Sequence, residues 1–105
     1  MGLQKEFFNK VYSGEKTIEL RLYDEKRKKL KIGDIISFHA SDAPTMTFEK
    51  KIMGLVKAKD FKALFDIIMP EQCGFDSFEN AIKTMQEFYP LKEQHDFGVV
   101  GIILG

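Results

Sequence analysis

The clearest pattern along the chain is an alternation of apolar and other residues between positions 17 and 23. Ile18, Leu20 and Leu22 fall on one side of an extended chain. The opposite side carries Thr17, Glu19, Arg21 and Tyr23. A period of two is typical of a strand that packs one face on a core and exposes the other. The pattern therefore predicts a half-buried strand over residues 17–23.

Spacings of three and four residues between apolar positions predict helices in three other segments. The first helix covers residues 4–13 and ends at Gly14, because glycine favours the left-handed conformation of a C-cap. The second helix begins at Asp60, whose side chain can act as an N-cap, and ends before Pro70. Its predicted inner face comprises Phe61, Leu64, Phe65 and Ile68.

The third helix is predicted to begin at Asp76 or Ser77 and to end at Tyr89-Pro90, because proline disfavours a helical conformation in the residue before it. Its apolar stripe comprises Phe78, Ala81, Ile82, Met85 and Phe88. Aromatic residues at helical spacing are predicted to lie in the core, namely Phe61, Phe65, Phe78 and Phe88. Phe75, beside Gly74 in a predicted loop, is the aromatic residue that we expect to be an exposed contact.

Three further stretches are predicted to be strands. Residues 35–40 follow a turn, and residues 46–57 form an extended stretch whose alternation breaks near Gly54, which indicates a bulge or bend. The intervening residues 41–45 are predicted to be a loop. Residues 97–104 are apolar on both faces, as in a central strand.

The order of these elements predicts the fold class. Helices and strands do not alternate regularly, so a Rossmann-like sheet is disfavoured. We expect an α+β fold in which a small, curved antiparallel sheet closes as a PUA-like barrel with flanking helices. A chain of 105 residues builds one sizeable core and is too short for two ordinary domains, so we expect a single domain over residues 1–105.

Composition excludes several classes of protein. No apolar run approaches the roughly 18–20 residues that cross a bilayer, and the first eight residues lack a signal-peptide core. Cys73 is the single cysteine, which permits no internal disulfide, favours a reducing cytoplasmic location and is typical of a small buried apolar residue. His39 and His95 are far apart, and the sequence contains no Gly-rich phosphate loop, so we expect no metal and no cofactor.

Charge is balanced overall but unevenly distributed. The chain carries 16 basic and 16 acidic residues, so its net charge is zero. Residues 21–31 contain six basic and two acidic residues, whereas residues 60–96 contain eight acidic and three basic ones. We therefore expect one positive end and one negative flank, an arrangement in which a neutral protein can present a patch for nucleic acid.

Several of these segments together resemble a known family. The stretch Gly14-x-Lys16-Thr17-x-Glu19-x-Arg21, followed by the basic run and Ile32-Gly33-Asp34, resembles the signature of ASCH domains. Phe88-Tyr89-Pro90 and residues 97–102 fit the C-terminal half of that family, so the resemblance covers nearly the whole chain. It implies a PUA-like β-barrel with helices over a cleft, and a role related to RNA.

One bacterial branch of the family hydrolyses the amide of N4-acetylcytidine. That branch uses a lysine after the motif glycine, a threonine in the following strand and a downstream glutamate. Lys16 matches the lysine, whereas Glu19 occupies the position of the threonine. The downstream glutamate has no clear match, and Glu71 and Glu79 are the nearest candidates.

Each candidate residue has a structural and a functional interpretation. Glu19 and Arg21 either pair on the polar face of a sheet or line a ligand cleft. In such a cleft Arg21 would donate to a phosphate or a base edge, Glu19 would accept from an amino group, and Tyr23 would offer a stacking surface. Lys16 is either a solvated turn lysine or a nucleophile, and a nucleophilic lysine must lose its proton, which Arg21 favours and Glu19 opposes.

We interpret the chain as a protein that binds RNA or a modified nucleoside in a cleft formed by Lys16, Thr17, Glu19 and Arg21. Tyr23, Lys28 and Lys29 are predicted to add ligand contacts, the two lysines by guiding a phosphate backbone unless they are merely solvated. The alternative is a small amidohydrolase acting on N4-acetylcytidine-like substrates, with Lys16 and Glu19 as catalytic residues. A purely structural or partner-binding domain is the third interpretation. The sequence leaves the oligomeric state open.

Overall fold

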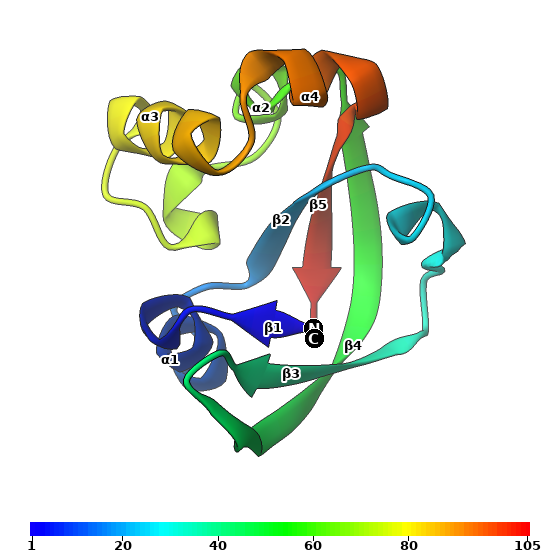
Figure 1. Cartoon of the computed structure of the whole chain (residues 1–105), viewed down its shortest axis with the longest axis vertical. Coiled ribbons are helices and arrows are strands. Elements are labelled where there is room, and N and C mark those ends of the chain that lie inside the picture. The colour runs from blue at the N-terminus through cyan, green and yellow to red at the C-terminus, as the bar shows by residue number, and fades with distance from the viewer.

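A curled mixed sheet forms the centre of the structure, with helices beside it and over one of its ends (Figure 1). The computed structural model describes residues 1–105, apart from the side chain of Pro44. In chain order its elements are β1 (Gly2–Leu3), α1 (Lys5–Ser13), β2 (Ile18–Leu22), η1 (Arg27–Lys29), β3 (Ile35–Ala40), β4 (Ala43–Ala58), α2 (Phe61–Leu64), η2 (Pro70–Cys73), α3 (Phe78–Phe88), α4 (Leu91–Phe97) and β5 (Val99–Leu104).

The described strands lie in the order β1-β3-β4-β5-β2. Strand β1 is parallel to β3, and the other neighbouring pairs are antiparallel. The curled sheet forms a half-barrel with flanking helices, which confirms the predicted α+β class and the small curved barrel. The short strand β1, which was not predicted, makes the sheet mixed rather than purely antiparallel.

Strand β4 is long and bent, and it joins the two halves of the sheet by pairing with both β3 and β5. Its register shifts between Ile52 and Gly54. A Cβ atom at Gly54 would lie 3.0 Å from Cδ1 of Ile103, so a glycine permits this close approach. The bulge predicted near Gly54 is confirmed. The predicted loop over residues 41–45 is shorter than expected because β4 begins at Ala43; the side chain of Pro44 lies outside the described residues.

Strand β5 lies between β4 and β2, and each of its faces packs on a different apolar cluster. Val99 belongs to a cluster with residues of β2, α2 and α3. Val100 and Ile102 belong to a second cluster with residues of α1 and β3. The prediction of a central strand apolar on both faces is therefore confirmed.

Strand β2 differs from its prediction because both of its faces are covered. Ile18 and Leu20 are buried as expected, but Glu19 on the opposite face is also only 3% exposed. The reason is that β1 and α1 cover this second face: Arg21 of β2 donates a hydrogen bond to the carbonyl of Gly2. Alternation identified the strand correctly, and the expectation of an exposed polar face was wrong.

Helix α3 buries a narrower stripe than its periodicity predicted. Ala81 and Met85 are buried, whereas Phe78 and Phe88 are 38% and 43% exposed. The expectation that these two phenylalanines lie in the core was therefore wrong, since they lie at the two ends of the helix. Phe75, expected to be exposed, is buried and packs edge-on against neighbouring rings.

The predicted N-caps are present. Asp60 accepts a hydrogen bond from the amide of Ala63 at 2.8 Å, and Ser77, rather than Asp76, accepts one from the amide of Asn80 at 3.1 Å. Helix α4 was not predicted, because Pro90 ends α3 and also stands as the N-cap residue of the next helix. In the part of the chain that the structure describes, no helix has the length and apolar character needed to cross a membrane.

Candidate functional site

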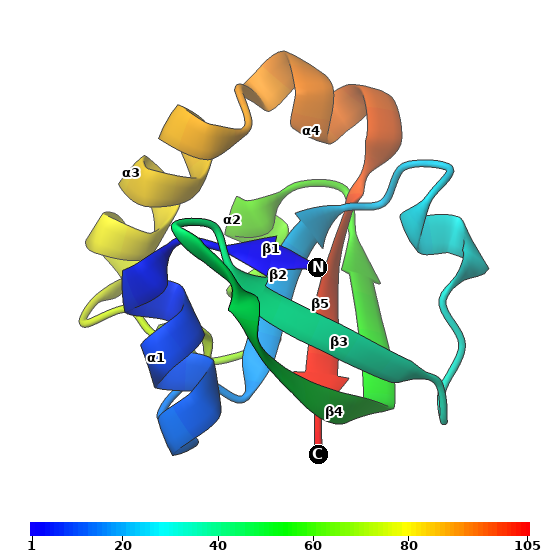
Figure 2. The ribbon, with the colours of Figure 1, turned by 60° about the horizontal axis from the view of Figure 1, so that its bottom comes forward.

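A cleft of about 190 Å³ is lined by residues of β1, α1, β2 and the end of α3. Figure 2 shows the course of these elements in the backbone. Strand β2 supplies its floor with Glu19, Leu20 and Arg21. One wall comes from the N-terminal segment, with Gly2, Leu3, Gln4 and Phe7. The other wall comes from α3 and the residue after it, with Met85, Phe88 and Tyr89, and Ser41 completes the rim. Segments distant in sequence therefore meet around two charged side chains.

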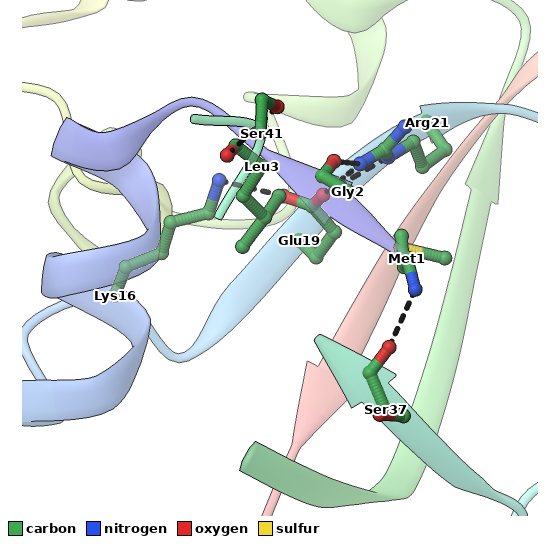
Figure 3. A network of polar contacts seen from close by, with 8 residues as sticks. All are labelled: Met1, Gly2, Leu3, Lys16, Glu19, Arg21, Ser37 and Ser41. Atoms are coloured by element: carbon green, nitrogen blue, oxygen red, sulfur yellow. Dashed lines mark hydrogen bonds and ion pairs between the residues drawn. The ribbon is translucent and has the colours of Figure 1, made fainter. Parts of the chain in front are cut away.

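The polar centre of the cleft is the carboxylate of Glu19, which lies between two cations (Figure 3). Nζ of Lys16 donates to Oε1 at 2.7 Å, and Nε of Arg21 donates to Oε2 at 2.9 Å. Nη2 of Arg21 lies 2.8 Å from the same Oε2 and also donates to the carbonyl of Gly2 at 2.9 Å. Strand spacing explains the second pair, since residues two apart lie on the same face of β2.

Opposing effects determine the pKa of Glu19. Burial is the largest effect and by itself raises the pKa of this carboxyl, because it penalises the charged form. The charges of Lys16 and Arg21, together with the hydrogen bonds they donate, outweigh burial and hold the pKa below its usual value. Glu19 is therefore ionised at neutral pH, and it is fixed in orientation by both cations.

Lys16 lies beneath the cleft rather than in it. Its side chain is 5% exposed, and Nζ is 4.6 Å from the centre of the Phe7 ring. The described residues that line the cleft include Glu19 and Arg21 but not Lys16. The interpretation of Lys16 as a solvated turn residue was wrong. Its ammonium group instead forms an ion pair with Glu19 and makes a cation–π contact with the ring of Phe7.

The remaining predicted ligand residues lie outside this cleft. The side chain of Thr17 is exposed, and its main chain bonds to Gln72 and Leu104. Tyr23 lies further along the chain from Arg21, with Nζ of Lys57 at 4.8 Å from its ring centre. Lys28 and Lys29 are exposed in η1, where Nζ of Lys28 is 3.3 Å from a carboxylate oxygen of Glu25 and 5.9 Å from the ring centre of Tyr23.

Neither candidate for the downstream glutamate reaches the cleft. Glu71 and Glu79 are both exposed, and Glu71 borders a different hollow beside Lys10. Cys73 lies nearby as a fully buried side chain, and burial raises the pKa of its thiol to about 12. Among the residues that the structure describes, no three His, Cys, Asp or Glu side chains are grouped so as to hold a metal ion.

The aromatic walls were missed as site residues. Phe88 was assigned to the core, yet its ring lies 6.4 Å from that of Phe7 and both line the cleft. Tyr89, 6.5 Å from Phe88, lines it as well. The signal in the sequence was the pair Phe88-Tyr89 before Pro90, because two adjacent aromatic residues at the end of a helix cannot both face the protein core.

The family model and the similar solved structures can be compared with this chain over nearly its whole length. The ASCH domain family matches residues 1–98. The crystal structure of the hypothetical protein PH0355 is similar at 35% identity over 99% of this chain and 94% of that one, with a TM-score of 0.86. Protein PF0455 from Pyrococcus furiosus, solved by NMR, gives 32% identity over 99% and 92% of the two chains and a TM-score of 0.76.

A more distant structure shares the fold. ASCH from Zymomonas mobilis is 17% identical, with a TM-score of 0.72 over the whole of this chain and 64% of that one. No curated protein matches the sequence.

Proposed function

The chain belongs to the ASCH domain family, and we propose that it binds RNA or a modified nucleoside with one base held in the cleft. The observation that supports this proposal is the pairing of an ionised Glu19–Arg21 floor with the aromatic walls Phe7 and Phe88. A nucleobase presents the complementary features, namely flat apolar faces and an edge of hydrogen-bond donors and acceptors.

The size of the cleft favours a small ligand unit. Its volume of about 190 Å³ is below the roughly 300–1,000 Å³ that is usual for pockets holding drug-sized ligands. A single base fits this scale better than a stack of bases does. Aromatic stacking contributes about 1–3 kcal/mol per base and tolerates any sequence. Phe88, which is 43% exposed, is positioned for such a contact because its ring borders both the cleft and solvent.

The floor of the cleft adds polar selection. Arg21 has donors that can reach a base carbonyl or ring nitrogen, and Oε1 of Glu19, which among the described residues accepts from Lys16 alone, keeps a lone pair that can accept from an exocyclic amino group. Gln4 supplies an amide at the rim. The buried ion pairs hold these groups in one orientation before a ligand arrives, which lowers the entropy cost of binding.

The basic loop that follows β2, residues 24–31, is proposed to guide a phosphate backbone. Burial lowers the pKa of the Met1 amino group, and the charges of Arg21, Lys26 and Arg27 lower it further. Arg21 in the cleft and two cations of the loop therefore all lie close enough to affect the Met1 amino group. Lys28 and Lys29 extend this positive region into solvent, where they can neutralise phosphates.

The geometry favours binding over amide hydrolysis. A nucleophilic lysine needs an unprotonated amine with access to the substrate. Nζ of Lys16 instead lies 2.7 Å from an ionised Glu19, and Lys16 does not border the cleft. A threonine in place of Glu19 would leave that lysine without a carboxylate partner. The alternative of an N4-acetylcytidine amidohydrolase therefore receives no support from this arrangement.

Binding of nucleosides and short single-stranded RNAs, measured by isothermal titration calorimetry, tests the proposal. We expect Phe88→Ala to weaken binding by about 1–3 kcal/mol, the value of one stacked base. Phe97→Ala is the matched control, because Phe97 is similarly exposed at 48% but lies on α4. Equal effects of both variants, or no binding by the wild type, would contradict the proposal.

A turnover assay separates the alternative. Protein incubated with N4-acetylcytidine is expected to release no cytidine above the uncatalysed rate. Release that disappears in Lys16→Ala, with folding preserved, would favour the hydrolase instead.

A further inference from the structure

The charges of Lys16, Glu19 and Arg21, the polar group at the floor of the cleft, do not cancel. Lys16 and Arg21 each carry one positive charge, and Glu19 carries one negative charge, so the group has a net charge of +1. The side chains of Lys16 and Glu19 are 5% and 4% exposed, and that of Arg21 is 16% exposed. Water therefore has little access with which to screen the excess charge.

The neighbouring side chains provide no second anion. Among the described residues that line the cleft, Glu19 is the only acidic one. Cys73 lies close enough to feel the charges of Lys16 and Glu19, but its pKa of about 12 keeps it a neutral thiol. Glu71, which also acts on Cys73, is exposed to solvent. The excess positive charge is thus a property of the site.

Arg21 is the cation of this group that a ligand can reach. Its Nε and Nη2 atoms are occupied by Glu19 and by the carbonyl of Gly2. Among the described residues its Nη1 atom makes no hydrogen bond, and the side chain lines the cleft. At a half-buried site the attraction between opposite charges is about four times stronger than in bulk water.

We propose that the ligand unit held in this cleft carries a negative charge of its own, as a phosphorylated nucleoside does, and that this charge lies against Nη1 of Arg21. The inference rests on the proposed function and narrows it: the ligand is a nucleotide rather than a free nucleoside. The base occupies the aromatic walls, and one phosphate completes the charge balance of the floor. The phosphate comes either from a free mononucleotide or from the backbone of an RNA strand.

The experiment compares each nucleoside with its 3′- and 5′-monophosphates, and both with a short single-stranded RNA, by isothermal titration calorimetry at fixed low salt. For the wild type we expect at least one monophosphate to bind about tenfold or more tightly than its nucleoside, the gain typical of one hydrogen bond to a charged group. This ratio is measured within one protein, so it does not depend on a variant that folds poorly.

Three variants assign the preference to the net charge. Lys16→Met removes one positive charge from a residue that does not border the cleft, so the group becomes neutral and the ratio is expected to fall to within about threefold of unity. The double variant Lys16→Met/Glu19→Gln restores a net charge of +1, carried by Arg21 alone, and is expected to recover the preference. Lys62→Met removes an exposed charge on α2 and should leave the ratio unchanged.

The outcomes separate this inference from the proposed function. A nucleoside that binds as tightly as its monophosphates overturns the inference and leaves base binding in place. Failure of every nucleoside, nucleotide and RNA to bind overturns both. A mononucleotide that binds more tightly than its nucleoside and as tightly as the RNA supports the inference with a free nucleotide as the source of charge. Tighter binding of the RNA, with the same loss in Lys16→Met, supports it with a strand as the source.

Discussion

The carboxylate of Glu19 lies between two cations in a place that water hardly reaches, and its neighbours determine how the fold responds to acid. Removing one partner from a buried ion pair leaves the other charge uncompensated and is strongly destabilising. Glu19 pairs with Lys16 and Arg21 simultaneously, so one buried and one partly buried cation depend on it. This double dependence makes its ionisation a condition for the stability of the cleft.

Acid is therefore expected to destabilise the protein through Glu19. The folded-state pKa of this group lies below its ordinary value of 4.5, because Lys16 and Arg21 outweigh the opposing effect of burial. A lowered folded pKa contributes stability that is present above the unfolded pKa and is lost as the pH falls through the folded pKa. The free energy of unfolding should thus decline below about pH 4.5.

The variant Glu19→Gln tests this linkage. At neutral pH it should lower the free energy of unfolding by about 3–5 kcal/mol, because the buried Lys16 and the partly buried Arg21 lose their counter-charge. Below about pH 4.5 its stability should fall less steeply than that of the wild type, since it has no such group to protonate. Urea denaturation at several pH values measures both effects. The exposed Glu79→Gln should behave as the wild type does, and a variant at position 19 that does the same would refute the linkage.

At this scale the sequence predicted only part of the group formed by Lys16, Glu19 and Arg21. Pairing of Glu19 with Arg21 followed from their spacing on one strand, and it was one of the two interpretations weighed. Burial of Lys16 did not follow, because it depends on α1 bringing Phe7 over the lysine. A local pattern reports which face of a strand a residue occupies, but not which distant segment covers that face.

At the scale of elements, periodicity identified the inward side of each helix but not how far burial extends along it. Phe61 on α2 is 1% exposed and stacks on Tyr89 at 6.0 Å between ring centres. Phe78 begins α3 and is 38% exposed, with an edge contact to Phe65 at 6.4 Å. Both were predicted to be core residues, but their different positions along the helices leave Phe61 buried and Phe78 exposed.

Truncation of these two side chains should have unequal costs. Phe61→Ala should lower the free energy of unfolding by about 3–5 kcal/mol, because it removes a fully buried ring and leaves a cavity. Phe78→Ala should cost at least about 2 kcal/mol less, because its site opens to solvent and leaves little cavity. Urea denaturation midpoints with equal slopes compare the two. Equal losses in the two variants would show that the start of α3 is packed more tightly than its exposure indicates.

At the scale of the whole molecule, the cleft depends on segments that the sequence could not bring together. Strand β1 has two residues, which is too short for any periodic signal, yet it forms one wall and accepts a hydrogen bond from Arg21. The other wall comes from the end of α3. The family signature located the floor because it is one continuous stretch, whereas the walls arise from tertiary packing.

The uneven distribution of charge gives the last prediction. Although the chain is neutral, the basic loop places Lys28 and Lys29 in solvent beyond the cleft. If this loop guides a phosphate backbone, the affinity for single-stranded RNA should fall as salt rises, with a slope of about 0.7 per neutralised phosphate on logarithmic axes. The double variant Lys28→Glu/Lys29→Glu should weaken binding of all sequences by similar factors and reduce the slope by about 1–2.

The double variant Lys62→Glu/Lys92→Glu is the matched control, since it changes the net charge equally on α2 and α4. If net charge alone steers the RNA, both double variants should weaken binding to the same extent. If the loop contacts the backbone, the control should retain most of the affinity and the full salt slope, because its charges lie on α2 and α4 and not on the loop. A wild-type affinity that is independent of salt would remove the loop from the binding surface and leave the cleft as the sole contact.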